Sequence, residues 1–254
     1  KMISAGQVLE IGLAIQKAAN LRVPEYQRNY NWERENVEDF WGDLLESHRT
    51  QQDHFFGSLI LETHGDDGAV SDVVDGQQRL TTFFVLIARL RDELVRIDPN
   101  GRVEEGGESF SLLDELNKFL GKHPSSIKYR PNSLILDVFE DICKLPSHDY
   151  GENQLKIKQD FEGRDIRQQS EREDAAATLP LRNTYFRIKQ LVKKHLEEIA
   201  DMAPSAEASQ VKVNEIYKLS QTARTRFKVL PISTNSQRES LEVFLTTNDR
   251  GMDL

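Results

Sequence analysis

The feature that most constrains the fold is a short apolar strand that ends at a glycine and leads into a long amphipathic helix, over residues 72–94. Val73 and Val74 precede Asp75 and Gly76, and glycine, which has no Cβ, allows the chain to turn sharply there. Apolar residues then recur at spacings of three and four, namely Leu80, Phe83, Phe84, Ile87, Leu90 and Leu94. The pattern therefore predicts a strand, a tight turn and a helix with one apolar face.

Polar groups gather at the start of this helix, in residues 75–79. The first N–H groups of a helix lack partners within it and the helix dipole is positive there, so such a point attracts anions. Arg79 adds a planar fork of donors that suits phosphate or carboxylate. A plainer interpretation also stands, in which Asp75 caps the helix and Arg79 forms a surface ion pair.

Three stretches of sequence resemble a known family. Residues 75–79 read DGQQR, residues 23–32 read VPEYQRNYNW and residues 244–254 read FLTTNDRGMDL. In this order they resemble the central, opening and closing motifs of the N-terminal domain of GmrSD-type restriction endonucleases, within the wider ParB/sulfiredoxin-like superfamily. Residues 55–61 also match the strand that precedes DGQQR in that family. The resemblance covers residues 23–254, although residues 102–173 carry no matching motif.

The resemblance implies a set of functional residues, because DGQQR is the nucleotide-handling motif of the family. The residues expected to be catalytic are Asp75, Gln77, Gln78 and Arg79. Those expected to bind the cofactor are Tyr26, Gln27, Arg28, Gly76, Thr81, Asn248 and Arg250. Asp75 is the only carboxylate in DGQQR and is the expected metal ligand. The implied cofactors are an NTP, with its base unspecified, and Mg²⁺ or another divalent cation.

The chemistry of several of these residues leaves alternatives open. Tyr26 and Trp32 suit stacking on a base, but Trp32 flanks a predicted helix start and is equally suited to anchor that helix in the core. Gln27 and Gln78 carry neutral amides, which orient a water or a phosphate oxygen but cannot act as bases. Asp75 suits a divalent cation, a water or a helix cap.

By resemblance, the function is that of a nucleotide-binding, NTP-hydrolysing regulatory domain in a modification-dependent DNA restriction or anti-phage defence system. The alternatives are a non-catalytic module that is switched by nucleotide or recognises DNA, and a purely structural partner-binding domain. In the resembled systems the domain is joined to, or works with, an HNH-type nuclease domain. The six histidines form no H-x-x-x-H pair. We therefore expect no nuclease activity from this chain alone, and we expect the chain to be part of a longer protein.

The composition of the chain limits the classes of partner and cofactor that it can bind. The net charge of the 254 residues is −9 at pH 7, so no global basic field favours nucleic acid, and any DNA contact must be local. The single cysteine, Cys143, excludes an internal disulfide and a multi-cysteine zinc site. Neither a G-x-x-x-x-G-K-[ST] loop nor a G-x-G-x-x-G fingerprint is present, so a nucleotide site must be of another design. No apolar run approaches the roughly 20 residues that span a bilayer, and we expect a cytoplasmic protein without membrane contact.

The expected fold class is α+β: a small ParB-like β-sheet that bears the strand–turn–helix site, embedded in a mainly α-helical body. Residues 1–100 are expected to form the nucleotide-binding core with the YQR and DGQQR motifs. Residues 101–225 are expected to be mainly helical, with a charged excursion at 149–174. Residues 226–254 are expected to form a strand and a helix that pack back on the core.

The periodicities also predict individual elements. Helices are expected at residues 8–19, 33–51, 77–97, 112–120, 134–145, 180–202, 211–222 and from 236 onward. Strands are expected at residues 55–62, 69–75, 126–130 and 226–233. We expect an acidic loop at residues 101–107 and Pro180 in the first turn of its helix. The last helix is expected to bury Leu241, Phe244 and Leu245, which would carry Asn248 and Arg250 to the site.

Overall fold

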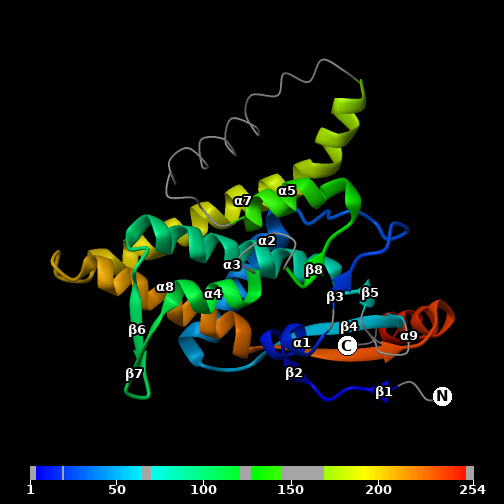
Figure 1. The fold of residues 1–254 in the computed structure, drawn as a ribbon, viewed down its shortest axis with the longest axis horizontal. Coiled ribbons are helices and arrows are strands. Elements are labelled where there is room, and N and C mark those ends of the chain that lie inside the picture. Colours follow the sequence, from blue (N-terminus) through cyan, green and yellow to red (C-terminus); the bar gives the residue numbers. More distant parts are fainter. Residues whose placement is uncertain (1–3, 19, 65–69, 121–126, 145–168, 250–254) are drawn as a thin grey trace.

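The computed structural model describes residues 4–18, 20–64, 70–120, 127–144 and 169–249. A mainly helical body lies on one side of a β-sheet (Figure 1). The α+β class and the helical body are thus confirmed. The division of the chain into three domains stays a prediction, and one hydrophobic cluster draws residues from both the first and the last of the predicted segments, as Ile11 and Val229 illustrate.

The sheet combines segments from both ends of the chain. Its strand order is β1 (Ser4–Ala5), β9 (Phe227–Thr234), β4 (His54–His64), β5 (Val70–Asp75), β3 (Asn20–Arg22) and β8 (Tyr129–Arg130), and β2 (Leu9–Glu10) also pairs with β9. The strands predicted at residues 55–62 and 69–75 are present as β4 and β5, and they pair with each other as antiparallel neighbours. The late strand β9 runs parallel to β4, which brings residues near the end of the chain beside the DGQQR turn.

Helix α3 forms the centre of the helical body. The helices are α1 (Ile11–Lys17), α2 (Arg34–Thr50), α3 (Gln77–Ile97), α4 (Leu112–Leu120), α5 (Ser133–Cys143), α7 (Gln169–Asp201), α8 (Ala208–Thr225) and α9 (Gln237–Asp249). The bounds of α3 agree with the prediction. Every residue from 80 to 94 is buried, including the polar ones, because α4, α5, α7 and α8 surround the helix.

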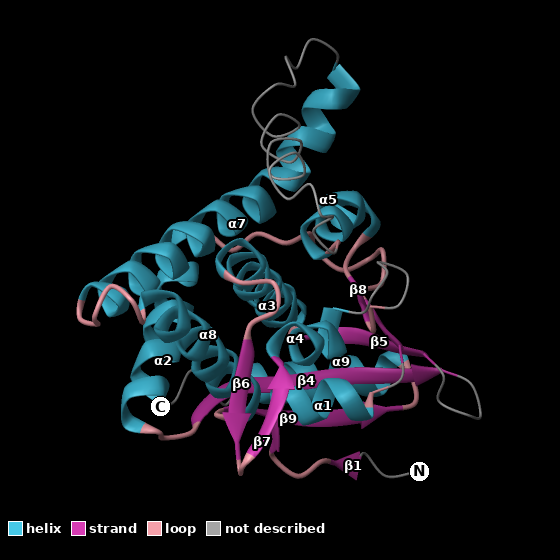
Figure 2. Cartoon of the chain, turned by 60° about the vertical axis from the view of Figure 1, so that its left-hand side comes forward, coloured by secondary structure: helices cyan, strands magenta, loops and turns pink. Residues whose placement is uncertain are grey.

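The two faces of the sheet have different covers. Leu59 and Val73 belong to the large cluster with α3, whereas Ile60 and Ile232 pack with Val243 of α9. Successive residues of a strand point to opposite faces, so the helical body covers one face and α9 covers part of the other. Figure 2 shows the strands below and the helical body stacked above them.

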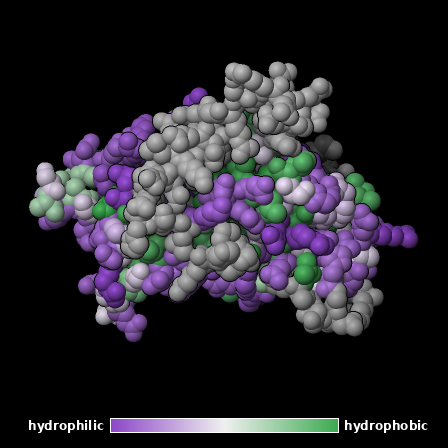
Figure 3. Space-filling model, turned by 45° about the horizontal axis from the view of Figure 1, so that its top comes forward, coloured by the Kyte–Doolittle hydropathy of each residue, from purple (hydrophilic) through white to green (hydrophobic). Residues whose placement is uncertain are grey.

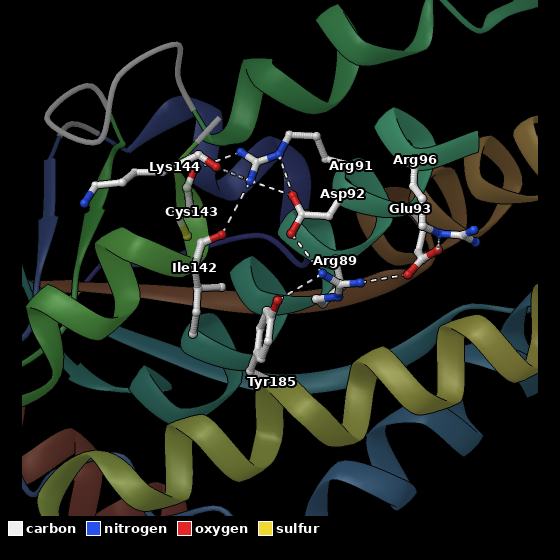
Figure 4. A network of polar contacts seen from close by, with 9 residues as sticks. All are labelled: Arg89, Arg91, Asp92, Glu93, Arg96, Ile142, Cys143, Lys144 and Tyr185. Atoms are coloured by element: carbon white, nitrogen blue, oxygen red, sulfur yellow. Dashed lines mark hydrogen bonds and ion pairs between the residues drawn. The ribbon is translucent and has the colours of Figure 1, made fainter. Parts of the chain in front are cut away.

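Burial of α3 places charged side chains in the core, where they must be paired. Arg89 donates to Asp92 (2.9 Å), Glu93 (2.8 Å) and the Tyr185 hydroxyl (3.1 Å). Arg91 donates to Asp92 and to the carbonyls of Ile142, Cys143 and Lys144 at the end of α5 (Figure 4). These carbonyls lack partners within their own helix, so Arg91 serves as the C-terminal cap of α5.

A second buried polar cluster joins three helices of the body. The Nε2 atoms of His195 on α7 and His48 on α2 lie 2.6 and 3.1 Å from one carboxylate oxygen of Glu215 on α8. Burial raises the pKa of Glu215, but the hydrogen bonds from His195 and His48 outweigh it and lower the pKa from 4.5 to about 2. The cluster therefore favours an ionised Glu215 at neutral pH.

Three predicted elements differ from the structure. The acidic loop predicted at residues 101–107 is wrong: β6 (Arg102–Glu105) and β7 (Glu108–Ser111) form a hairpin. Gly106 and Gly107 supply its turn, with φ of +60° and +84°. Pro180 lies inside α7 and not in its first turn. Residues 9 and 10, predicted as helix, form β2 because β9 offers them a partner.

The expected burial of α9 is correct only in part. Leu241 and Leu245 were expected to be buried but are 55% and 52% exposed, whereas Phe244, also expected to be buried, is partly buried beside the buried Val243. The apolar residues of this helix lie on two sides, and the sheet takes the side that carries Val243. Residues 149–168 of the predicted excursion, and residues 250–254 of the closing motif, lie outside the described residues, and α7 already begins at Gln169.

The surface agrees with the charged composition. On the face shown in Figure 3 the described residues are mainly hydrophilic, and hydrophobic residues form small separate groups. Among the described residues, no helix combines the length and apolar character that crossing a membrane requires.

Candidate functional site

The predicted strand–turn–helix is present and its turn is tight. β5 ends at Asp75, Gly76 has a φ of +95°, and α3 begins at Gln77. A Cβ at Gly76 would lie 2.3 Å from Cδ2 of Leu59 on β4. Both the left-handed backbone and the lack of space require glycine at this position.

A cleft of about 580 Å³ opens at this turn, and we call it the DGQQR cleft. Residues 75–79 form its floor, Gln27, Arg28 and Trp32 come from the segment before α2, and Val74 and Phe244 add apolar surface. The structure thus brings the YQR and DGQQR motifs together, along with one residue of the last helix, although more than 200 residues separate Arg28 from Phe244.

Arg79 braces the neighbouring strand. Its Nη1 donates to the carbonyl of Phe56 (2.9 Å), and its Nη2 donates to the carbonyl of Ser58 (2.8 Å) and to Asp75 (3.1 Å). The guanidinium lies against Gly57, where a Cβ would fall 1.5 Å from Nη1 and where φ is +102°. Here the register between β4 and β9 shifts, and Arg79 binds the carbonyl of Phe56 within that shift and the carbonyl of Ser58 just after it.

Asp75 does not cap α3, so the capping interpretation is wrong. The N-cap is Gly76, and within the described part of the chain it has no side-chain capping hydrogen bond. Asp75 instead pairs with Arg79 over four residues, and about a quarter of each side chain is exposed. Among the described residues it is the only carboxylate that lines the DGQQR cleft.

The two glutamines of the DGQQR motif make different hydrogen bonds. Gln78 holds the preceding segment through both ends of its amide, because Oε1 accepts from the backbone N–H of Asn31 and Nε2 donates to the carbonyl of Asn29, each at 3.0 Å. Gln77 makes a longer contact of 3.4 Å from its Nε2 to Oε1 of Gln27. Gln78 is thus a structural tether, and Gln77 and Gln27 form an amide pair in the cleft wall.

Arg28 is a cation of the cleft lining whose side chain has no partner among the described residues. Its side chain is exposed, and no hydrogen bond or ion pair joins it to another residue in the part of the chain that the structure describes. Since Asp75 and Arg79 pair with each other, Arg28 supplies the net positive charge of the lining. Arg79 was expected to be catalytic and Arg28 to bind the cofactor; in the structure the Arg79 side chain is held by β4 and Asp75, whereas that of Arg28 has no partner among the described residues.

The aromatic residues before α2 occupy different environments. Trp32 packs against Tyr30 and Phe40, with ring centroids 6.4 and 6.2 Å away, and its remaining surface lines the cleft. Tyr26 is half-exposed and lies outside the DGQQR cleft. Partial burial raises the pKa of its phenol, and the nearby carboxylates, of which Glu62 has the larger effect, raise it further.

Three predicted cofactor residues are not placed in the cleft. Thr81 is buried, and its hydroxyl donates to the carbonyl of Gln77 (2.8 Å) and lies 2.8 Å from the hydroxyl of Tyr129. One helical turn after Gln77, its side chain faces β8 and not the cleft. The side chain of Asn248 and the whole of Arg250 lie outside the described residues.

Asp75 is the residue of the DGQQR cleft that would hold a divalent cation. Within the described ranges no three histidine, cysteine, aspartate or glutamate side chains form a group that could hold a metal. Mg²⁺, however, is commonly held by one or two carboxylates, with water and substrate phosphates as its other ligands. One carboxylate at the floor of an open cleft fits that mode.

Sequence reasoning missed the apolar walls of the cleft, Val74 and Phe244. Phe244 is the first residue of the closing motif, and this position was the one available signal that the last helix contributes to the site.

The structure is thus that of an α+β domain with a polar cleft where a strand meets the N-terminus of a buried helix.

The class can be named more closely by comparison with known proteins. The sequence model of the family described as "GmrSD restriction endonuclease, N-terminal domain" matches residues 11–254. The match covers nearly the whole chain, and the chain belongs to this family. No match was found among curated proteins.

Proposed function

We propose that the DGQQR cleft binds the phosphates of a nucleoside triphosphate, and that the domain uses this nucleotide to regulate a DNA restriction system. The proposal rests on one observation: the N-terminus of α3, whose N-cap Gly76 offers no side-chain cap, and Arg28, whose side chain has no partner among the described residues, line the same cleft. Phosphates bind such N–H groups through hydrogen bonds and the helix dipole. Arg28 would add charge-assisted hydrogen bonds to them.

Each remaining residue of the cleft has a role in this proposal. Asp75 would hold Mg²⁺ together with phosphate oxygens, and the cation would offset the charge of the phosphates. Arg79 acts as a positioning residue, because it fixes the Asp75 carboxylate and the β4 carbonyls in place. The amide of Gln77 would orient a water, and Asp75 is the one group among the described lining residues that could accept a proton from it.

A second candidate function is a switch that binds nucleotide without hydrolysing it. It is favoured by the use of Gln78 and Arg79 as structural ties, which leaves few groups free for chemistry. Binding and hydrolysis are separable in one experiment. The purified chain is titrated with each NTP, with and without Mg²⁺, and phosphate release is followed in the same samples.

Saturable, Mg²⁺-dependent binding together with phosphate release supports the NTPase. Binding without release selects the switch. The absence of binding by all four nucleotides would contradict both functions. A catalytically dead Asp75→Asn protein serves as the control for contaminating phosphatases, since it should lose Mg²⁺-dependent release while remaining folded.

A further inference from the structure

A second hollow, of about 520 Å³, adjoins the DGQQR cleft, and we call it the α9 groove. The two hollows share Gln27, Val74 and Phe244 in their linings. The α9 groove adds Tyr26 from the segment before α2, and Gln237, Arg238 and Leu241 from α9; Arg238 pairs with Glu242 on the same helix. A ligand held in the cleft therefore has the α9 groove as its direct continuation.

Part of the lining of the α9 groove is apolar and exposed to solvent. Tyr26 is 57% exposed and Leu241 is 55% exposed, although both are large and apolar in most of their surface. Phe244 and Val74 lie beneath them, packed on the small cluster between α9 and the sheet. A flat ring laid on these residues would remove apolar surface from water on both partners, which is favourable.

The polar residues of the groove suit the edge of such a ring. Gln27 and Gln237 carry side-chain amides, and each amide offers both donors and an acceptor. Heterocyclic bases present the same mixture of donors and acceptors at their edges, and they stack well on aromatic side chains. An aliphatic ligand would use neither the amides nor the face of Tyr26.

We propose that the α9 groove receives the nucleobase of the nucleotide whose phosphates occupy the DGQQR cleft. This inference rests on the proposed function and extends it, since it assigns base recognition to Tyr26 and to Leu241 of the last helix. It also gives a reason for the exposure of Leu241, a residue whose helical spacing favours burial.

The test compares nucleotides with inorganic tripolyphosphate, which has the phosphates and no base. Calorimetric titration in Mg²⁺ is carried out on the wild type, Tyr26→Ala, Leu241→Ala and Arg28→Ala. Leu134→Ala on α5 is the matched control, because Leu134 is 51% exposed and lines neither hollow. Tyr26→Phe keeps the aromatic face and tests stacking separately from the hydroxyl.

We expect Tyr26→Ala to weaken binding of the preferred NTP by about five- to a hundredfold, the range that base–aromatic stacking energies convert to. Leu241→Ala should weaken it less, and Tyr26→Phe and Leu134→Ala should leave it close to the wild-type value. None of these four variants should change the affinity for tripolyphosphate, whereas Arg28→Ala should weaken binding of both ligands.

The outcomes separate this inference from the function on which it rests. If the wild type binds both ligands, and Tyr26→Ala and Leu241→Ala bind NTP as tightly as the wild type, the base site is refuted while the phosphate site stands, and the groove has another occupant. If the two variants lose NTP and tripolyphosphate equally, the groove does not recognise the base. If the wild type binds neither ligand, both the proposed function and this inference are overturned.

Discussion

Replacement of Arg79 by alanine tests how the DGQQR motif is used. The substitution removes the donors to the carbonyls of Phe56 and Ser58 and the partner of Asp75. Hydrogen bonds from a charged donor contribute about 1.5–3 kcal/mol each, and partly exposed ion pairs contribute at most about 1 kcal/mol. Because 23% of the Arg79 side chain is exposed, water replaces part of this loss. We expect a net destabilisation of about 2–4 kcal/mol.

In a chain of this size a loss of 1 kcal/mol lowers the Tm by about 2–4 °C, so Arg79→Ala should melt about 5–15 °C below the wild type. The assay is scanning calorimetry of the protein without nucleotide. Arg28→Ala is the matched control: it removes the same guanidinium from the same cleft, but one without partners among the described residues, and its stability should change by less than about 0.5 kcal/mol. Arg79→Lys should recover only part of the loss, because a single ammonium does not reproduce the fork that reaches two carbonyls.

The reasoning would be refuted by an Arg79→Ala protein that melts within about 1 °C of the wild type and has lost its nucleotide affinity. Arg79 would then be a phosphate ligand and not a brace. The opposite result, a lowered Tm with NTP affinity within tenfold of wild type at a temperature where the variant is folded, would establish the structural role.

Other parts of the fold give three further predictions. Glu215→Gln should destabilise the protein at pH 7. The contacts with His195 and His48 lower the pKa of Glu215 in the folded state, so the loss in free energy of unfolding should be full above pH 4.5 and vanish as the pH falls to about 2. Urea unfolding at a series of pH values measures this loss. A loss that does not change with pH would contradict the lowered pKa of Glu215. Arg91→Met should cost about 3–5 kcal/mol because it removes one of the two arginine partners of the buried Asp92 and leaves the carbonyls at the end of α5 unpaired, whereas Arg34→Met, at an exposed pair, should cost below about 1 kcal/mol; equal losses would contradict this account of the network. The chain alone should not cut modified or unmodified DNA duplexes with Mg²⁺ or Mn²⁺, and metal-dependent cleavage that copurifies with it would show the expectation to be wrong.

Local patterns predicted the centre of this fold well. The bounds of α3 followed from its apolar spacing and from Gly76, because both signals lie within the helix or at its N-cap. The hairpin of β4 and β5 followed in the same way from two apolar runs around a turn. The hairpin at Gly106 was missed because its acidic residues suggested a loop, although two successive glycines are also a hairpin turn signal.

Contacts between distant residues could not be predicted in this way. The partners of Arg79 include backbone carbonyls on β4. Every residue has a backbone carbonyl, so the sequence does not indicate which ones an arginine will bind. The same holds for Arg91, whose partners at the end of α5 lie about 50 residues away. Helical spacing grouped Leu241 with Phe244 and Leu245, but only the position of the sheet decides which side of α9 is covered.

The most direct test of the central claim is the affinity of Arg28→Ala for a Mg²⁺-bound nucleotide. Arg28 has no structural partner among the described residues, so its loss should affect binding without affecting the fold. A charge-assisted contact of about 1.5–3 kcal/mol corresponds to a Kd about ten- to a hundredfold higher, and the Tm without nucleotide should be unchanged. A folded Arg28→Ala protein that binds the nucleotide as tightly as the wild type would contradict the account of the DGQQR cleft.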